Sequence, residues 1–259
     1  MTEHRDPSAP QLDDALAPHE RLDTRSTAST VVRGRPASDG RTRRAIATRA
    51  RLTTAARTLF VRDGYASTTV AAVARAAGVA EQTVYYSYPT KAELLVGCLD
   101  HAVDGTDRVP GHAPADLTGL AWVRTALEEP DASQRLFLHV RGFADLMSRA
   151  APLLDVLRLA GAGEASLAQA WEQDESRRRA VHEALVETYL RDAVPAQTTE
   201  HPPAPGPEGA TDVVGLVLGP ETWNALVGRA GWSRLAWARW AHRSLLAELA
   251  PGTVLGSST

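Results

Sequence analysis

Hydrophobic residues recur every three or four positions along most of the chain, which is the period of an α-helix with one buried face. No segment alternates apolar and polar residues as a half-buried strand does. The pattern predicts helices over residues 43–62, 69–77, 81–86, 91–103, 118–128, 131–149, 152–160, 164–192, 212–229 and 232–249. The predicted fold class is therefore all-α.

Glycine and proline mark the breaks between these helices. Gly64 and Gly78 follow apolar runs, at places where a helix end favours a left-handed residue. Pro89 prevents the third run from continuing, and Thr90 with Glu93 forms a capping box for the helix after it. Residues 104–116 are predicted to be a loop, and the proline-rich residues 193–212 a flexible loop.

The two short runs, 69–77 and 81–86, are joined by a tight glycine turn in the order of a helix-turn-helix. In that motif the second helix enters the major groove of DNA. Val79, Val84 and Tyr88 are expected to anchor this helix inward. The side chains then left facing outward are Glu81, Gln82, Thr83, Tyr85 and Tyr86.

Charge is distributed unevenly, although the formal net charge is only −3. Residues 33–62 contain nine arginines against a single aspartate. A basic segment on an acidic body is typical of a protein that binds a polyanion, although a solvated basic helix has the same composition. Residues 1–40 are predicted to be a disordered arm, in which Arg33 and Arg35 would enter a narrow minor groove; a plain flexible tail is the alternative.

The most specific pattern is an ordered set of short motifs: RTLFVRDGY at 57–65, TTV at 68–70, AAGV at 76–79, TVYY at 83–86 and YPTKAELL at 88–95. In this order they resemble the DNA-binding domain of the TetR family of transcriptional regulators. The resemblance implies phosphate contacts by Thr68 at the cap of helix 69–77, and by Tyr85, Tyr86 and Lys91. Gln82 and Thr83 are the candidates for reading base edges, because an amide can bridge N6 and N7 of adenine.

Two positions depart from the family pattern. Ala80 stands where a capping serine or threonine is usual, so the second helix lacks a side-chain cap. Glu81 stands where a small or basic residue is common, and it can accept a hydrogen bond from N4 of cytosine. These changes bear on base preference and leave the class of protein unchanged.

By the same resemblance, residues 104–192 are expected to hold a pocket for a small-molecule effector. The candidate lining residues are the large side chains Trp122, Phe137, His139, Phe143, Met147, Trp171 and Tyr189. Ordinary core packing is the alternative for each of them. His139 stands alone on its predicted helix, so neither a metal site nor a cofactor is expected.

The last two predicted helices, 212–229 and 232–249, are apolar on two sides, which predicts burial on two sides. One face would meet the chain's own body and the other a second copy. The predicted dimer interface consists of Trp223, Leu226, Trp237, Trp240 and Ala241. The alternative is a monomer with a thick core.

Other classes of protein leave no trace in the sequence. There is one cysteine, no signal peptide and no apolar run of membrane-spanning length, so a cytoplasmic protein without a membrane partner is expected. Enzyme motifs such as HExxH and GxSxG are missing, so no enzyme is expected. The sequence predicts two domains, DNA-binding at 41–103 and effector-binding with dimerisation at 104–250, followed by a disordered tail at 251–259. Together they would form a homodimeric repressor that leaves a palindromic operator on binding an effector; a ligand-independent architectural DNA-binding protein is the alternative.

Overall fold

The structure is a computed structural model that describes residues 38–104, 116–192 and 206–249. Over these ranges the chain forms helices and no strand, which confirms the all-α fold class. The helices are α2 (Ser38–Ser67), α3 (Val70–Ala77), α4 (Glu81–Ser87), α5 (Lys91–Asp104), α6 (Ala121–Glu128), α7 (Ala132–Gly161), α8 (Ala165–Asp192), α9 (Pro207–Leu218), α10 (Pro220–Trp223) and α11 (Arg234–Leu249). Short turns at η1 (Leu117–Gly119) and η2 (Asn224–Arg229) complete the described elements.

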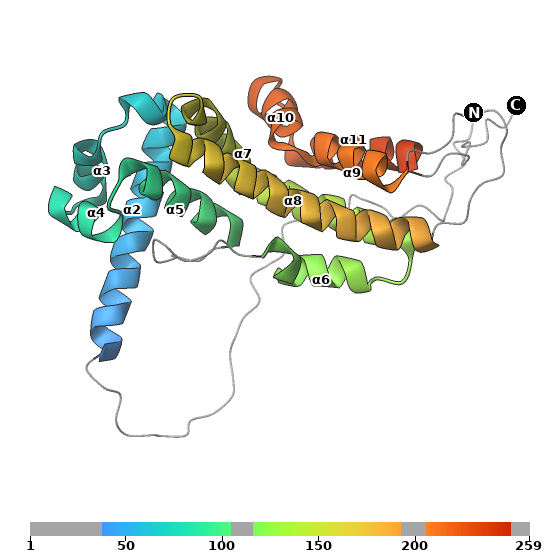
Figure 1. Ribbon diagram of the computed structural model, residues 1–259, viewed down its shortest axis with the longest axis horizontal. Helices are drawn as coiled ribbons and strands as arrows, with labels where there is room; N and C mark the ends of the chain where they lie inside the picture. The colour runs from blue at the N-terminus through green and yellow to red at the C-terminus, as the bar shows by residue number, and fades with distance from the viewer. Residues whose placement is uncertain (1–37, 105–115, 193–205, 250–259) are drawn as a thin grey trace, which may run out of the picture.

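The helices gather into two groups that share one long helix. Helices α2 to α5 lie together at one end of the molecule, and α7 and α8 run side by side along the rest of it (Figure 1). Helix α6 covers one side of this pair, while α9, α10 and α11 cover the other (Figure 1). Helix α7 contacts α2 and α5 in the first group and α6, α8 and α11 in the second, so it connects the two.

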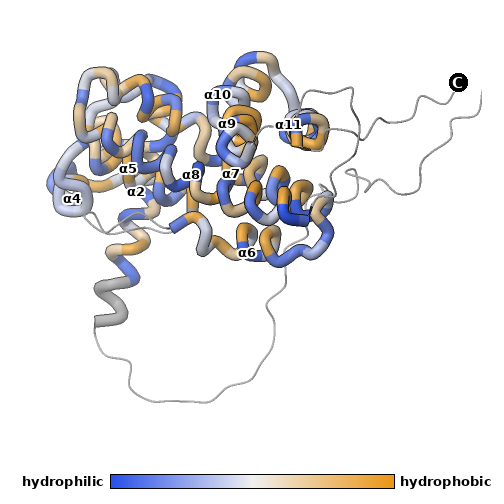
Figure 2. Tube along the Cα trace, turned by 45° about the vertical axis from the view of Figure 1, so that its right-hand side comes forward, coloured by the Kyte–Doolittle hydropathy of each residue, from blue (hydrophilic) through white to orange (hydrophobic). Residues whose placement is uncertain are grey.

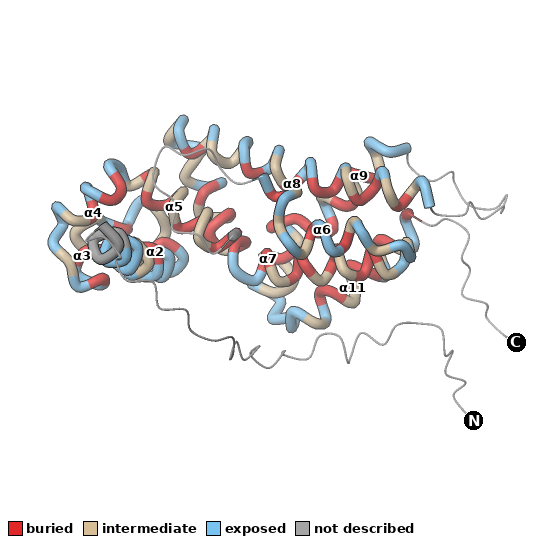
Figure 3. The backbone as a smooth tube through the Cα atoms, turned by 90° about the horizontal axis from the view of Figure 1, so that it is seen from below, coloured by how far each residue is buried: buried red, intermediate tan, exposed pale blue. Residues whose placement is uncertain are grey.

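The core follows the apolar faces of these helices. Figure 2 shows hydrophobic residues alternating with hydrophilic ones along the helices, and Figure 3 shows buried residues alternating with exposed ones in the same helices. Helix α7 is buried along most of its length, from Leu136 to Leu157, because helices pack on several of its sides.

Two predicted helices, 131–149 and 152–160, are a single helix, so the predicted break between them is wrong. Helix α7 continues through Pro152, which lacks only the N–H that would bond to the carbonyl of Ser148. Packing on both sides of the proline keeps the helix intact, and the side-chain amide of Asn224 donates to the carbonyl of Ala151 at 3.0 Å.

The predictions for residues 193–229 need two corrections. Regular structure begins inside the predicted loop 193–212, because α9 starts at Pro207, and proline fits the first turn of a helix. The predicted helix 212–229 is broken at Gly219 and Pro220, after which α10 and the wide turn η2 follow. A side chain at Gly219 would lie 2.7 Å from the carbonyl oxygen of Gly215, so this bend requires glycine.

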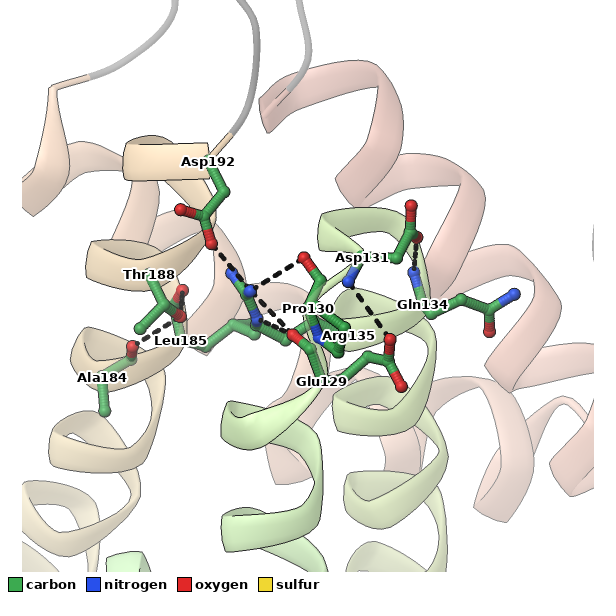
Figure 4. Close-up of polar contacts among 9 residues, drawn as sticks. All are labelled: Glu129, Pro130, Asp131, Gln134, Arg135, Ala184, Leu185, Thr188 and Asp192. Carbon is green, nitrogen blue, oxygen red and sulfur yellow. Dashed lines mark hydrogen bonds and ion pairs between the residues drawn. The ribbon is translucent and has the colours of Figure 1, made fainter.

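The end of α8 is tied to the loop between α6 and α7 by Arg135 (Figure 4). This side chain is 4% exposed. Its Nε and Nη2 donate to the carbonyl of Glu129 at 2.9 and 2.7 Å, and Nη2 pairs with Asp192 at 2.7 Å. Asp131 caps α7 by accepting the N–H of Gln134 at 2.7 Å. Charge-assisted contacts of this kind fix the ends of three helices together.

Candidate nucleic-acid interface

Helix α3 has a defined cap at each end. The side chain of Thr69 accepts the N–H of Ala72 at 3.1 Å, as an N-cap threonine does. At the other end Gly78 has φ 67° and ψ 40°, which is the left-handed conformation. Its N–H donates to the carbonyl of Arg75 at 3.2 Å, and that of Val79 donates to Ala74 at 3.0 Å. These two bonds form a Schellman motif, which ends α3 and turns the chain into α4.

Helix α4 is held by its inner face. Val84 and Tyr88 are each 1% exposed, and Val79 is half-buried, which agrees with the predicted anchors. The ring of Tyr88 lies against Gly97 of α5 so closely that a Cβ there would be 2.4 Å from Cε1 of the tyrosine. This close approach sets the distance between α4 and α5.

The outer face of α4 collects the predicted DNA-contacting residues on one surface. Tyr86 is 86% exposed and Tyr85 50% exposed. Glu81 and Gln82 are also exposed, and Thr83 is half-buried. Ala80 makes no side-chain cap, as predicted, and Glu81 in the first turn has a favourable interaction with the helix dipole instead.

The assignment of Thr68 as the helix cap is wrong, because the neighbouring Thr69 occupies that position. Thr68 is 2% exposed, and its hydroxyl donates to the carbonyl of Gly64 at 2.8 Å. It therefore helps to close the end of α2, where Gly64 has a positive φ of 79°. Thr69, which is exposed at the start of α3, is better placed than Thr68 to meet a phosphate.

Lys91 has an internal role that the sequence did not reveal. Its Nζ donates to the carbonyls of Tyr65 and Thr68 at 3.0 and 3.2 Å. The same nitrogen lies 4.2 Å from the centre of the Tyr65 ring. A cation at these carbonyls stabilises the end of α2. Contact of Lys91 with a DNA phosphate remains a prediction, in addition to this structural role.

The basic residues near this surface differ in availability. Arg44 and Arg51 of α2 and Arg75 of α3 are exposed. Two others are engaged, since Arg62 pairs with Asp63 at 2.7 Å and Arg57 donates to the carbonyl of Arg149 at 3.1 Å. Arg33 and Arg35, predicted to reach the minor groove, lie outside the described residues.

The residues predicted to line an effector pocket gather around α7 and α8. Five of them are buried, namely Phe137, His139, Phe143, Met147 and Tyr189, while Trp122 and Trp171 are half-buried. The ring of Trp122 lies over Gly142, where a Cβ would be 2.0 Å from Cε3 of the indole. His139 is not alone, because His182 of α8 faces it with ring nitrogens 3.2 Å apart. Sequence reasoning missed this partner because it lies 43 positions further along the chain.

Three of the five residues predicted at a dimer interface lie in the chain's own core. Trp223, Trp237 and Ala241 are 4%, 0% and 0% exposed, and the two tryptophan rings contact each other at 4.9 Å between centroids. The two-face interpretation of the last helix is wrong, because its buried residues share a single wide face that packs on α7 and α9. Leu226 and Trp240 remain half-buried at the edge of this packing.

A contact between the two groups of helices was also missed. The hydroxyl of Tyr65, at the end of α2, donates to Glu164, just before α8, at 2.8 Å. Burial and this hydrogen bond both raise the pKa of Tyr65. A second contact joins the two groups, because Nε of Arg149 in α7 donates to the carbonyl of Ala102 in α5 at 2.9 Å. No sequence pattern marks these residues, since each partner is distant along the chain.

Comparison with known proteins agrees with this arrangement. The family model of bacterial regulatory proteins of the tetR family matches residues 52–98, which run from α2 through α3 and α4 into α5. No curated protein sequence matches the chain.

Solved structures share this helical fold over about four-fifths of the chain at low sequence identity. The transcriptional regulator FadR from Bacillus subtilis, in complex with stearoyl-CoA, has a TM-score of 0.57 at 16% identity, with 79% of this chain and 99% of FadR covered. A TetR-family regulator from Mesorhizobium loti has a TM-score of 0.56 at 20% identity, covering 80% and 96% of the two chains. NalD, the secondary repressor of the MexAB-OprM efflux pump in Pseudomonas aeruginosa, has a TM-score of 0.55 at 19% identity, covering 79% and 97%.

Among the described helices, none has the length and apolar character needed to cross a bilayer.

The helix-turn-helix at α3 and α4, the family match over the same residues and the shared helical fold lead to one assignment. Residues 52–98 match the tetR family of bacterial regulatory proteins, and the chain shares its helical fold with solved structures of transcriptional regulators.

Proposed function

We propose that the chain is a homodimeric repressor that leaves a palindromic operator when a small molecule binds to its second domain. The observation that supports this most is the outer face of α4, where Gln82, Tyr85 and Tyr86 are exposed although α4 itself is firmly anchored. Residues 41–103 would form the DNA-binding domain and residues 104–250 the effector-binding and dimerisation domain. Gln82 and Thr83 would read base edges, and Thr69, Tyr85 and Tyr86 would contact phosphates.

A dimer would use the apolar side chains that remain outside the core of the second group. Leu216 of α9 is 66% exposed and Trp232 is 37% exposed. Trp240 packs its ring edge-on against Trp232, with centroids 6.4 Å apart. Covering this surface with the same surface of a second copy would hold two α4 helices at a fixed separation. About 34–36 Å between them would match successive major grooves on one side of the duplex.

Helix α7 supplies the connection between effector and DNA. Its first half carries His139 and Phe143, and its second half carries Arg149, next to α2 and α5. Pro152 follows Arg149 and removes one hydrogen bond of the helix, so the segment that carries His139, Phe143 and Arg149 can change its angle to the rest of α7 at small cost. An effector that shifts the first half would then change the position of α2 to α5, and with it the separation of the two α4 helices.

Selection of bound duplexes from a random DNA pool tests the first part of this proposal. We expect an enriched palindrome whose half-sites are about one helical turn apart. The measured mass of the complex should correspond to two chains. Binding without sequence preference, with a salt slope of about −0.9 per phosphate neutralised, would favour the ligand-independent architectural protein instead.

The effector response is tested on the operator so obtained. Operator affinity is measured with and without each small molecule of a panel, and release by at least one of them is expected. If operator affinity is the same with every compound, the effector part of the proposal is wrong and the DNA-binding part is unaffected.

A further inference from the structure

Two histidines face each other inside the second group of helices. His139 of α7 is 0% exposed and His182 of α8 is 2% exposed, and Nε2 of the first lies 3.2 Å from Nδ1 of the second. The ring of Phe143 packs against both, with centroids 4.9 and 4.5 Å away. Trp122 packs edge-on against His139 at 6.1 Å. The pair is therefore enclosed by aromatic rings.

The contact between the two rings determines what their outer nitrogens can bind. Burial lowers the pKa of His139 to about 3 and lowers that of His182 as well, so both rings are neutral at neutral pH. One neutral ring must donate to the other. Of the outer nitrogens, Nδ1 of His139 and Nε2 of His182, one is then a donor and the other an acceptor. Neither has a hydrogen-bond partner among the described residues.

A buried nitrogen without a hydrogen-bond partner is uncommon in a folded core, because a buried polar group without a partner destabilises the fold. The side of the His182 ring that faces Gly215 of α9 is not closely packed against that glycine. A Cβ at Gly215 of α9 would have only Cδ2 of His182 within 4 Å, at 3.9 Å. This ring carbon is bonded to Nε2, so the outer nitrogen of His182 lies at the seam between α8 and α9.

The charges around His182 favour an acidic partner. Besides burial, which is the main cause, and His139, the positive charges of Arg178 and Arg179 on α8 lower the pKa of His182. The acids that face these arginines are already paired. Asp174 binds Arg178 at 2.8 Å, while Glu183 and Asp212 of α9 bind Arg179 at 3.0 and 2.6 Å. Helix α7 contributes His139, and α6 contributes the uncharged Trp122.

We propose that His182, supported by His139, recognises the effector, and that the effector is a monocarboxylic acid with an apolar body. This inference rests on the effector site of the proposed function and gives it a chemical class. The carboxyl group bonds to Nε2 of His182, and the apolar body lies along the seam between α8 and α9.

Proton balance distinguishes this ligand from its neutral and cationic analogues. A carboxylate entering the dry site takes one proton from solvent, which rests on the carboxyl oxygen or on Nε2 of His182. An alcohol takes none, and an alkylamine must release its proton to enter. Carboxylate affinity should therefore fall by about tenfold for each pH unit above neutrality.

The test is calorimetry of the full chain in buffers of equal pH and different ionisation enthalpy. The probes are straight-chain carboxylates from butyrate to palmitate together with benzoate and phenylacetate, each beside the matching alcohol and amine. We expect at least one carboxylate to bind with uptake of about one proton, more tightly than its alcohol and amine. If no carboxylate of the panel binds, or if one binds without proton uptake, the proposal is wrong.

Variants then assign the proton to the histidine pair. His182→Gln and His139→Gln should each weaken carboxylate binding by about tenfold or more. His242→Gln is the matched control, because His242 is buried on α11 against Phe137 and outside the pair. Thermal unfolding shows whether each variant folds. If a variant does not fold, the proton uptake measured on the unaltered chain decides whether the proposal holds. Unchanged binding in both folded pair variants would overturn the proposal.

Operator binding separates this inference from the proposed function. A carboxylate that binds through His182 but leaves operator affinity unchanged supports the inference and removes effector release from the proposed function. If only other compounds release the operator and no carboxylate binds, the proposed function is supported and the carboxylate inference is wrong.

Discussion

The outer face of α4 and the interior between α7 and α8 both carry polar side chains, but they hold them in opposite ways. On α4 the polar groups face solvent, and the helix is positioned by nearby elements: the turn at Gly78, and Tyr88 against Gly97. Between α7 and α8 the polar groups are buried and bonded to partners far along the chain, as His139 is to His182. The first surface can change its side chains without changing its fold, whereas the second cannot.

The comparison has a direct consequence for mutations. Substitutions on the outer face of α4 should alter DNA binding and leave stability nearly unchanged. Substitutions of buried polar groups in the second group should lower stability whatever they do to function. Each prediction below tests one side of this difference, beginning with the largest expected effect.

Asp174→Ala should be the most destabilising of these changes. The carboxylate is 1% exposed and pairs with Arg178 at 2.8 Å and with Arg177 at 3.1 Å. Its loss leaves a buried guanidinium without its partner, which typically costs about 3–5 kcal/mol in free energy of unfolding. Denaturant unfolding measures the change. Glu183→Ala, which breaks an exposed pair on the same helix, is the control and should have a much smaller effect.

Gly97→Ala should disturb α4 from its inner side. The new Cβ would lie 2.4 Å from Cε1 of Tyr88, which is itself 1% exposed, so the ring must move and carry the end of α4 with it. We expect a loss of about 1–3 kcal/mol in stability together with weaker binding to every DNA site. Gly163→Ala is the control, because its Cβ would approach nothing closer than 3.9 Å. Equal stability of the two variants would contradict the close packing of Tyr88.

Gln82→Ala should affect specificity alone. Gln82 is exposed and supports no other described element, so thermal unfolding should be unchanged. Preference at one base pair should relax, by about 1–3 kcal/mol, while affinity for other sites of the operator series stays the same. Lys91→Ala is the contrasting variant. It should weaken all sites alike, and it should also lower stability, because Lys91 binds two carbonyls at the end of α2.

This contrast also explains which parts of the fold could be predicted from the sequence. The turn at Gly78, the anchors Val84 and Tyr88, and the exposed face of α4 depend on residues within a few positions of each other. Their signals are therefore present in a short stretch of sequence. Even there the cap was placed one residue early, at Thr68, because two adjacent threonines carry the same signal.

Features that depend on distant partners could not be predicted. The internal role of Lys91 needs carbonyls 23 and 26 positions away, and the partner of His139 lies on another helix. The face of α11 that holds Trp237 was taken for an interface, because an apolar face does not reveal whether its own chain or a second copy covers it. A break was predicted between residues 149 and 152, although packing on both sides of Pro152 keeps α7 continuous.

Tyr65→Phe should be the least destabilising of the substitutions that remove an internal contact, and it tests the link between the two regions. The variant keeps the ring that stacks on Phe60, at 5.9 Å between centroids, and removes only the hydroxyl that donates to Glu164. A loss of about 0.5–1.5 kcal/mol in stability is expected for one hydrogen bond. Because the contact borders a hollow of about 490 Å³ between the groups, no close packing replaces it when it is lost.

The useful measurement is operator affinity with and without effector. If the contact of Tyr65 with Glu164 holds α2 to α5 in position, its loss should reduce the ratio between these two affinities. Tyr85→Phe is the matched control, since it removes a hydroxyl from the outer face of α4 and should change both affinities equally. If the ratio of the two operator affinities is unchanged in Tyr65→Phe, the coupling between effector and DNA runs through the packed length of α7 alone. The two regions are then joined by apolar contacts, without this polar link.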